Sequence, residues 1–291
     1  MLMPLIECFD VGGTSIRGAI IENENILVKK TIPSVSGNFS ALISVIQQLS
    51  HEIRGLAKKE TVDGTIIGLP GPIRGNVLLN SGPLGITSSV SLGPLLQAFP
   101  NLVKIENDLK LAVHAEFFRG QGNGLDSFYL LAISTGMGTG LVWNKKIVSG
   151  TMGEFGHVVL DAKPAAIPCV LPHRGCWFAY SSGKGIEMQS SHSSKDVFLL
   201  AKNGDEKSKK IIAAARAANA HGIGNMLNVF AVQKIIIMGS LGLSQFEEII
   251  PTEQEIQPFT LHPIPPIVPS LLGDDVGLWG AYYFGVEAKK E

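Results

Sequence analysis

The sequence predicts an α/β protein of two related domains. The main observation is a unit of strand, glycine-rich turn and strand that occurs twice, at residues 5–21 and 127–148. A second observation is that short β-branched and aliphatic runs bounded by glycine, typical of strands, alternate with segments whose apolar residues recur at helical spacing. The repeated unit is in keeping with two domains of one architecture.

In the first half of the chain, the clearest helix signal lies between Asn38 and Lys58. Its apolar residues recur three or four positions apart, which indicates an amphipathic helix against a sheet. Strands flank the turn "DVGGT" on both sides. The other expected elements are strands at 26–33, 64–72 and 102–108, and a helix at 109–120.

In the second half, the helical and strand signals fade between residues 162 and 194. Five prolines between 258 and 269 exclude a regular helix there. The closing helix is expected to present Gly277 and Gly280 on a side that packs closely. The expected elements are strands at 127–134, 139–143 and 234–239, a helix-rich region at 205–230, a helix from Leu243 and a closing helix at 275–291.

The composition indicates a globular protein without a polyanionic partner. The 291 residues are 45% hydrophobic, which is enough for a substantial core. The formal net charge of −1 argues against nucleic acid as the main partner. A secretory signal is absent and no apolar run approaches the roughly 18 residues of a membrane helix, so we expect a cytoplasmic protein with no membrane partner. Three unevenly spaced cysteines suggest reduced thiols or metal ligands.

The first glycine-rich turn, "DVGGT", suits a phosphate and metal site. Gly12 and Gly13 allow the backbone to approach phosphate oxygens, and Thr14 adds a hydroxyl donor. Asp10 can hold Mg²⁺ through water. A glycine hairpin turn with a solvated acid explains this stretch equally well when it is taken alone.

A second turn and a third glycine site repeat this chemistry. In "STGMGTG", Thr135 and Gly136 can present hydroxyl and amide donors to another phosphate. In "MGSLG", Gly239 and Ser240 stand where an apolar strand ends and a helix opens, a position that suits the anionic or ribose part of a nucleotide. None of the three sites matches the Walker or Rossmann pattern.

Two polar motifs are candidates for the acceptor side of a reaction. In "END", Asn107 and Asp108 follow a strand at its C-terminal end, where ligands bind in open α/β sheets. Asp108 suits a general base, and it would equally suit a helix N-cap. In "GEFGH", Glu154 and His157 can hydrogen-bond vicinal hydroxyls, although such residues are more often surface groups.

The motifs "DVGGTSIRGAI", "GLPGP", "END", "STGMGTG" and "GEFGH", with "GSLG" downstream, stand in an order that resembles the ROK family of sugar kinases and related proteins, glucokinases among them. The resemblance covers residues 5 to 285, nearly the whole chain. It implies an actin-like ATPase fold, also called ribonuclease H-like, with two α/β domains around a central cleft. The implied domains are 1–110, joined by the C-terminal helix 275–291, and 111–274.

The resemblance also implies an activity, the transfer of the ATP γ-phosphate to a sugar hydroxyl with Mg²⁺. The implied acceptor is the 6-hydroxyl of glucose or a related hexose, and the implied assembly is a homodimer. Asp108 takes the role of base and Asn107 that of a sugar contact, with Glu154 and His157 as the sugar-binding pair. The positions implied to hold ATP and its metal are Asp10, Gly12, Gly13, Thr14, Thr135, Gly136, Gly239 and Ser240.

The chain departs from the family at a loop that binds zinc in many members. The family form is C-x-C-G-x-x-G-C-x-E, with the histidine of the "GH" pair as the fourth ligand, and this chain has "CVLPHRGCWF". Leu171 stands in place of the middle cysteine, so we expect zinc to be weakly bound or absent. His173 is a less favoured substitute. The retained ligands are His157, Cys169 and Cys176.

Two further departures concern the loop and the sugar. Phe178 replaces a glutamate that contacts the sugar in the family, and "LLNSGPLGI" replaces a sugar loop, with Asn80 as a possible contact. Both differences count against glucose as the preferred substrate. We expect Leu171, Trp177 and Phe178 to hold the zinc-loop region by apolar packing.

Three alternatives stay open beside a glucose-type kinase. The acceptor can be N-acetylmannosamine or another amino sugar. The chain can be a non-catalytic member that binds sugar or nucleotide, although the retained Asp108 counts against this. A sugar-sensing repressor is disfavoured, because the first strand begins by residue 5 and leaves no room for a helix-turn-helix segment.

Overall fold

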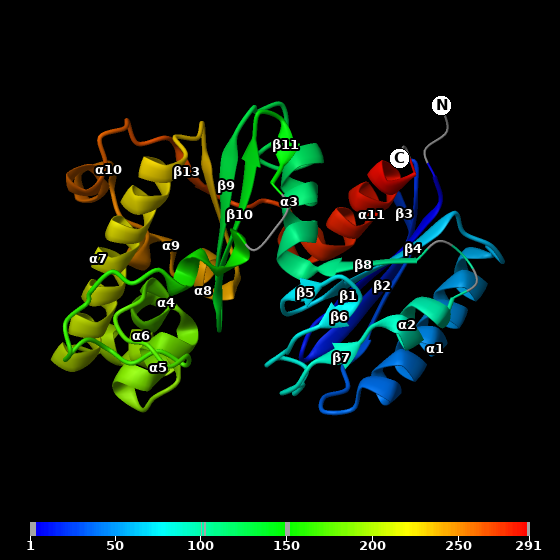
Figure 1. Ribbon diagram of the computed structural model, residues 1–291, viewed down its shortest axis with the longest axis horizontal. Helices are drawn as coiled ribbons and strands as arrows, with labels where there is room; N and C mark the ends of the chain where they lie inside the picture. The colour runs from blue at the N-terminus through cyan, green and yellow to red at the C-terminus, as the bar shows by residue number, and fades with distance from the viewer. Residues whose placement is uncertain (1–3, 100, 102, 149–151, 290–291) are drawn as a thin grey trace. The chain divides into compact units, whose positions relative to one another are not determined.

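The computed structural model describes residues 4–99, 101, 103–148 and 152–289, which form two compact units. The first unit contains the chain up to Asn123 and again from Leu272, and the second spans Gly124–Leu271. Each unit is built on its own five-stranded mixed sheet (Figure 1). None of the described helices combines the length and the apolar character needed to cross a membrane.

The observed unit boundary differs from the expected one at residue 110. That boundary would cut through helix α3 (Asp108–Phe118). All of α3 lies in the first unit, because α3 packs along helix α11 (Val276–Ala288). Of the expected closing helix 275–291, the last two residues lie outside the described residues.

The first sheet has the strand order β3-β2-β1-β4-β8. The hairpin of β1 and β2 is antiparallel, and β4 and β8 continue the sheet in parallel with β1. This pattern confirms the predicted hairpin around "DVGGT". The strands are β1 (Ile6–Val11), β2 (Ser15–Glu22), β3 (Asn25–Pro33), β4 (Gly64–Leu69) and β8 (Val103–Asn107).

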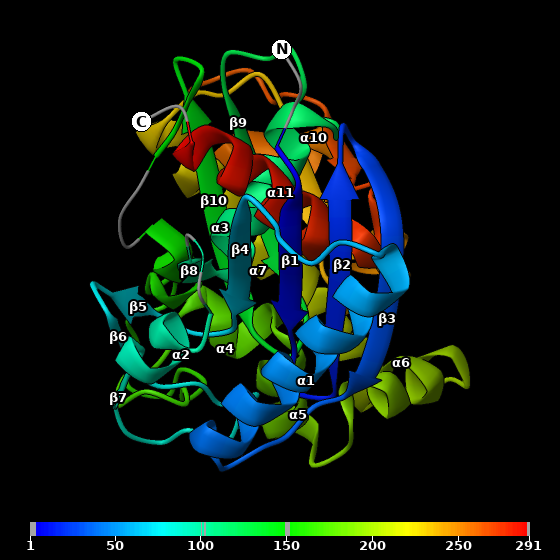
Figure 2. The ribbon, with the colours of Figure 1, turned by 90° about the vertical axis from the view of Figure 1, so that its right-hand side faces the viewer.

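Helices cover both faces of this sheet. Helix α1 (Phe39–Ala57), the predicted amphipathic helix, packs over β2 and β3 (Figure 2). Helices α3 and α11 form the layer on the other face. Because successive side chains of a strand point to opposite faces, Phe9 joins the core under α1 whereas Cys8 joins the core under α11. Asp10 therefore shares the α11 face with Cys8.

The second sheet repeats the topology of the first, with the order β11-β10-β9-β12-β13. Again an antiparallel hairpin is extended by two parallel strands. The internal repeat predicted from the sequence is thus confirmed. The strands are β9 (Phe128–Ile133), β10 (Met137–Trp143), β11 (Lys146–Ile147), β12 (Ile235–Met238) and β13 (Ile267–Pro269).

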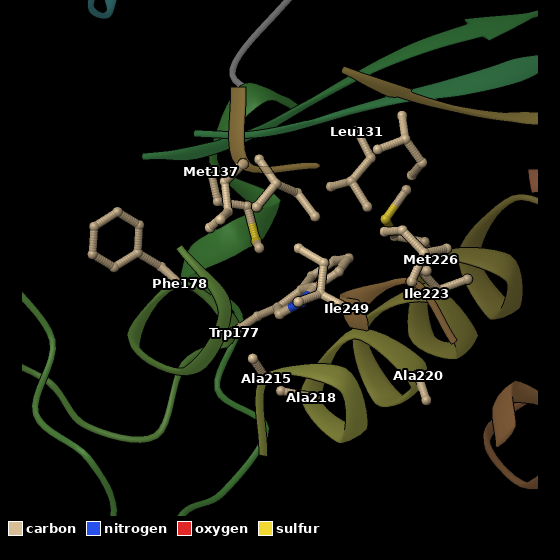
Figure 3. Packing of buried hydrophobic residues seen from close by; sticks show 14 of the residues in the cluster. Leu131, Met137, Trp177, Phe178, Ala215, Ala218, Ala220, Ile223, Met226 and Ile249 are labelled. Carbon is tan, nitrogen blue, oxygen red and sulfur yellow. The ribbon is translucent and has the colours of Figure 1, made fainter. Parts of the chain in front are cut away.

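The core of the second unit lies between its sheet and the long helix α7 (Glu206–Val229). Trp177 is fully buried at its centre (Figure 3). Its indole N–H donates to Asn219 Oδ1 at 2.6 Å. The other helices of this unit are α4 (Trp177–Ser181), α5 (Gly183–Ser190), α6 (Ser194–Lys202), α8 (Ser240–Ser244), α9 (Phe246–Ile249) and α10 (Glu253–Ile256), with 3-10 turns η1 (Met152–His157) and η2 (Gln257–Phe259).

Several short elements were not predicted from the sequence. Helices α4 and α5 lie where the helical signal faded, because each is too short to show a full apolar stripe. Strand β13 lies in the proline-rich passage, and Pro269 is tolerated there because β13 is an edge strand. The first unit also contains a small sheet and two short helical segments, namely β5 (Ile73–Arg74), β6 (Val77–Leu78), β7 (Val90–Ser91), α2 (Gly93–Gln97) and the 3-10 turn η3 (Gly273–Asp275).

Candidate functional site

The first glycine turn lies between β1 and β2, and its tightness has a steric cause. Gly12 N–H donates to Ser15 O at 2.9 Å, which closes the turn. A Cβ on Gly13 would stand 2.5 Å from the carbonyl oxygen of Pro83, so only glycine fits against that loop. Neither glycine has a positive φ, so space and not backbone conformation requires them here. Thr14 is exposed next to them.

Asp10 is the acid of this turn, and it is held between a cation and a helix. Its Oδ2 pairs with Arg17 Nη1 at 3.2 Å, across the β1–β2 hairpin. On the other side its carboxylate lies against Gly277 at the start of α11. Burial raises the pKa of Asp10, although Arg17 opposes this shift. A partly buried carboxylate with one cationic neighbour is suited to take up a second cation.

Asp108 lies at the C-terminal end of β8, where the structure separates its two predicted roles. The N-cap of α3 is Asn107, whose Oδ1 accepts from the N–H groups of Leu109 and Lys110 at 3.0 and 3.2 Å. Asp108 is the first residue of the helix, and its Oδ1 accepts from Leu109 N–H at 2.8 Å. The expectation that Asp108 could be the cap is therefore wrong.

Burial raises the pKa of Asp108 to about 6. The negative charge of Asp10 adds to this shift, so the two carboxylates lie close enough to interact. Hydrogen bonds from Leu109 N–H and from Asn107 Nδ2, the latter at 3.0 Å, oppose it by stabilising the anion. The result is a carboxylate that is mostly ionised at pH 7 and can still accept and hold a proton.

Asn80 is connected to this site through a glycine. Asn107 Nδ2 donates to Gly71 O at 3.0 Å, and a Cβ on Gly71, whose φ is +119°, would collide with Asn80 O. The "GLPGP" loop thus seats the exposed Asn80 close to Asn107. Both amide hydrogens of Asn107 are donated within the protein, to Gly71 and Asp108, so a sugar contact from Asn107 requires the exchange of one of them.

In the second unit, two of the four residues predicted for the nucleotide line one pocket. Thr135, on the β9–β10 turn, and Ser240, at the start of α8, both line a pocket of about 400 Å³. Gly239 precedes Ser240 with φ +87°, and its Cα packs so tightly on Ile133 O that a Cβ would collide. Gly136 completes the turn through its carbonyl, which accepts from Ser134 N–H at 2.9 Å.

Other residues of this pocket were not predicted. They come from α5, from α6 and from the end of α8, and α5 lies in the region where no helix was expected. The α5 N-terminus is tied to the turn, since Gly183 N–H donates to Ser134 O at 2.8 Å and Lys184 N–H to Thr135 O at 3.0 Å. In the sequence, the only features that pointed to these pocket residues were the "TG" turn and, much later in the chain, the "GKG" stretch. The added lining residues include Gly183, Glu187, Ser194, Lys195, Phe198 and Gln245.

Glu154 and His157, the predicted sugar-binding pair, face each other on η1. Glu154 Oε2 lies 3.8 Å from His157 Nε2, and the Glu154 side chain is 60% exposed. Burial lowers the pKa of His157, and His173 adds to this while Glu154 opposes it. A neutral imidazole and a free carboxylate can both hydrogen-bond sugar hydroxyls. The predicted sugar contacts are divided between the units, with Asn80, Asn107 and Asp108 in the first and Glu154 and His157 in the second.

Four potential metal ligands, His157 among them, lie close together. The structure brings His157, Cys169 and Cys176 together as predicted and adds His173, with one ligand atom of each within 4.8 Å of the others. Cys169 Sγ lies 3.4 Å from His157 Nδ1, so this histidine presents Nδ1 to the cluster and Nε2 to Glu154. Two thiols and two imidazoles are a ligand set that suits a tetrahedral zinc ion.

The expected apolar packing of the zinc-loop region is only partly present. Trp177 and Phe178 are buried, but they point to opposite sides of α4 (Figure 3). Trp177 enters the core, whereas Phe178 stacks on the His157 ring with the ring centres 5.0 Å apart. Leu171 is 47% exposed, so the expectation that it anchors the loop is wrong.

Comparisons with known proteins relate nearly the full chain to one family. The model of the ROK family matches residues 6–287. The N-acetylmannosamine kinase of Haemophilus influenzae (strain PittGG) is 29% identical, with 94% of this chain and 93% of that protein covered. The N-acetyl-D-glucosamine kinase of Yersinia pseudotuberculosis serotype O:3 (strain YPIII) is 28% identical, with 97% and 99% covered.

Among solved structures, the ROK hexokinase from Thermus thermophilus superposes with a TM-score of 0.83 at 22% identity, covering 98% of this chain and 99% of that one. At this level of identity the likeness concerns the fold. The predicted fold class, an actin-like ATPase fold with two α/β domains, is confirmed by this likeness together with the two five-stranded mixed sheets.

Proposed function

Because the chain belongs to the ROK family, we propose that it is a sugar kinase that transfers the γ-phosphate of ATP to a sugar hydroxyl, with Asp108 as the general base. The observation that carries this proposal is the environment of Asp108. It follows a strand end, its pKa is raised to about 6, and Asn107 holds its position. Among phosphoryl-transfer enzymes, positioning and charge neutralisation supply most of the catalysis.

The role of Asp108 is to take the proton of the attacking hydroxyl. Its two side-chain hydrogen bonds, from Leu109 N–H and Asn107 Nδ2, both end on Oδ1. We assign the proton transfer to Oδ2. The bonds on Oδ1 fix the plane of the carboxylate, so Oδ2 has a defined direction before the substrate binds. Such a base typically contributes about 10² to 10⁴ in rate.

The phosphates of ATP are assigned to the two glycine turns. In the first unit the turn offers the Thr14 hydroxyl and main-chain N–H groups other than that of Gly12, which donates to Ser15 O. In the second unit Thr135 and Ser240 line a pocket of about 400 Å³, a volume within the usual range for small-molecule sites. We assign the nucleoside part of ATP to this pocket.

A magnesium ion fits the surroundings of Asp10. Its carboxylate is partly buried and has only Arg17 as an ion-pair partner among the described residues, so the cost of burying its charge is not fully offset. Asp10 would hold the ion directly or through water. The ion would supply charge neutralisation at the phosphates, while Arg17 keeps the carboxylate oriented.

The acceptor that we favour is an N-acetylhexosamine. The two relatives compared above, which match nearly the whole chain, are kinases for such sugars, at 28% to 29% identity. Phe178 also replaces a polar family residue with an apolar ring, which stacks on His157. A hexose such as glucose, phosphorylated at the 6-hydroxyl, is the second candidate, and the ordered set of family motifs supports it.

A substrate panel tests the activity and the acceptor together. ADP release would be measured with ATP and Mg²⁺ on N-acetylmannosamine, N-acetylglucosamine, glucose and mannose. We expect kcat/KM to be highest for one of the N-acetylhexosamines. A preference for glucose would select the second candidate, and no turnover on any sugar would contradict the kinase proposal. The homodimer implied by the family pattern is a separate proposal, which sedimentation of the same preparation would test.

A further inference from the structure

The loop of residues 79–86 touches two parts of the first unit that the proposed reaction uses separately. One end of this loop lies beside Asn107, which holds Asp108, and its tip lies against the first glycine turn. A sugar contact by Asn80 involves only the first of these ends. The contact between the tip and the glycine turn has no part in that role and calls for an explanation of its own.

The 79–86 loop is a closed and anchored piece of backbone. Ser81 N–H donates to Ile86 O at 2.8 Å, and Ile86 N–H donates to Ser81 O at 2.9 Å. Leu84 and Ile86 are buried in the core under α1, and Ser81 is 1% exposed. A closed loop with buried anchors resists local deformation, so a displacement at one end is transmitted to the other.

At the tip of the loop, Pro83 packs on Gly13 of the glycine turn. A Cβ on Gly13 would stand 2.5 Å from Pro83 O and 3.0 Å from Pro83 Cβ, so both the backbone and the ring of Pro83 limit the space at this glycine. Pro83 is otherwise exposed, so burial in the core does not account for its place. The proline ring fixes φ of residue 83 and stiffens the tip at the point of contact.

The connector between β3 and α1 holds the turn and the loop together. Ser34 N–H donates to Thr14 O, on the turn, at 2.9 Å. Three residues later, Gly37 N–H donates to Leu84 O, on the loop, at 2.8 Å. The glycine turn, the connector and the 79–86 loop thus form one packed junction around Gly13, although they are far apart in the sequence.

The other end of the loop reaches the proposed base through two contacts. A Cβ on Gly71 would collide with Asn80 O, and Gly71 O accepts from Asn107 Nδ2 at 3.0 Å. The same Nδ2 donates to Asp108 Oδ1 at 3.0 Å. The 79–86 loop therefore connects the proposed base with the turn assigned to phosphate, and all of these residues belong to the first unit.

We propose that Pro83 is a positioning residue for the glycine turn, and that a sugar bound at Asn80 strengthens ATP binding through the 79–86 loop. The identity of these two ligands rests on the proposed kinase function. Gly13 N–H has no hydrogen-bond partner among the described residues, so it is free for a phosphate oxygen and Pro83 fixes its direction. A sugar that orders the loop lowers the entropic cost of ordering the turn around ATP. Because such coupling is reciprocal, ATP strengthens sugar binding by the same factor.

Hydrogen exchange tests the role of Pro83 without any turnover. The turn protects the Gly12 amide through its bond to Ser15 O. In Pro83→Gly this amide should exchange about 5-fold faster than in the wild type, because the tip no longer holds Gly13 in place. Pro263→Gly, at an exposed proline of the second unit, is the matched control and should leave the turn unchanged. Equal exchange in the wild type and Pro83→Gly would overturn the proposal, whether or not the chain phosphorylates a sugar.

Calorimetry with a non-hydrolysable ATP analogue and Mg²⁺ tests the coupling. An N-acetylhexosamine that the wild type binds should lower the Kd of the analogue at least about 5-fold, and Pro83→Gly should lose most of this effect. In turnover, Pro83→Gly should raise the KM for ATP more than it lowers kcat. An enhancement by the sugar that persists in Pro83→Gly would contradict the coupling.

A double-mutant cycle tests the contact itself. Gly13→Ala places a Cβ against Pro83 and should weaken binding of the ATP analogue. A flexible tip can yield to this Cβ, so Gly13→Ala combined with Pro83→Gly should bind the analogue more tightly than the two single effects multiplied together predict. Strictly multiplicative effects on Kd would show that Pro83 does not act through Gly13. Slow exchange of the Gly12 amide that depends on Pro83, in a protein without turnover on any sugar, would support the positioning role while refuting the kinase proposal.

Discussion

The carboxylate of Asp10 lies directly against the backbone of Gly277, which is 267 positions away in the sequence: a Cβ at Gly277 would stand 2.5 Å from Asp10 Cγ. The start of α11 therefore forms one wall of the Asp10 site. Asp274 and Asp275, just before this helix, add negative charge near Asp10, and Lys29 pairs with Asp275 at 2.8 Å. The first turn of the C-terminal helix thus positions the acid that the N-terminal strand supplies.

The first prediction follows from this contact. Gly277→Ala should push the Asp10 carboxylate aside, and a displacement of about 1 Å in a phosphate-positioning group can cost on the order of 10²-fold in rate. Steady-state kinetics at varied ATP and Mg²⁺ would measure it. Gly55→Ala is the control, because that helical glycine has open space around it and alanine should stabilise α1 by about 0.5–1 kcal/mol. Full activity in Gly277→Ala would show that Asp10 does not need its present position.

The second prediction concerns the base. Asp108→Asn should lower kcat by about 10² to 10⁴ with little change in sugar affinity, because the amide keeps the shape but cannot accept the proton. Sugar binding by calorimetry and turnover by ADP release would separate the two effects. Asp126→Asn, at an exposed acid of the second unit, is the matched control. A variant that keeps most of its kcat would remove Asp108 from this role.

The third prediction is the pH dependence of the wild type. Asp108 must be ionised to act as a base and its pKa is raised to about 6, so kcat/KM should fall as the pH drops through 6. A profile of kcat/KM between pH 5 and 9 would show this acidic limb. The residual activity of Asp108→Asn should lack the limb. A wild-type profile that stays flat down to pH 5 would contradict the assignment.

The fourth prediction links the same pKa to stability. The folded chain binds the Asp108 proton more tightly than the unfolded chain, whose value is near 3.8, so this group's contribution to folding stability decreases as the pH rises from 3.8 to about 6. Above that range the ionised, partly buried carboxylate is unfavourable. Asp108→Asn should therefore be at least as stable as the wild type at pH 8, and thermal unfolding at pH 4 and pH 8 would test this.

The fifth prediction concerns a buried ion pair under α1. Glu7 is fully buried and accepts hydrogen bonds from Arg54, Ser50 and Thr65, the shortest at 2.6 Å. Glu7→Ala would leave the Arg54 guanidinium without its partner and should cost about 3–5 kcal/mol in the free energy of unfolding. Urea denaturation would measure the loss. Glu52→Ala, which removes an exposed pair with Lys30, should change stability little, and equal effects of the two variants would contradict the argument.

The comparison of sequence and structure shows where local patterns suffice. The hairpin at "DVGGT", the amphipathic helix α1 and the repeated sheet unit were predicted, because alternation, helical spacing and glycine turns are local signals. Helices α4 and α5 were missed because they span only five and eight residues. The pocket residues that α5 contributes were missed for the same reason.

By itself the sequence determined the two α/β units, the order of the motifs and the chemical types of the candidate residues, since these depend on neighbours within a few positions. Only the tertiary structure decided that Asn107, and not Asp108, is the N-cap of α3. It also decided that Gly277 packs against the Asp10 carboxylate. In the same way, it decided that His173, and not Leu171, belongs to the Cys and His cluster. The physical reason is that the burial of a side chain and the identity of its partners depend on chain segments brought together by folding, up to hundreds of positions apart.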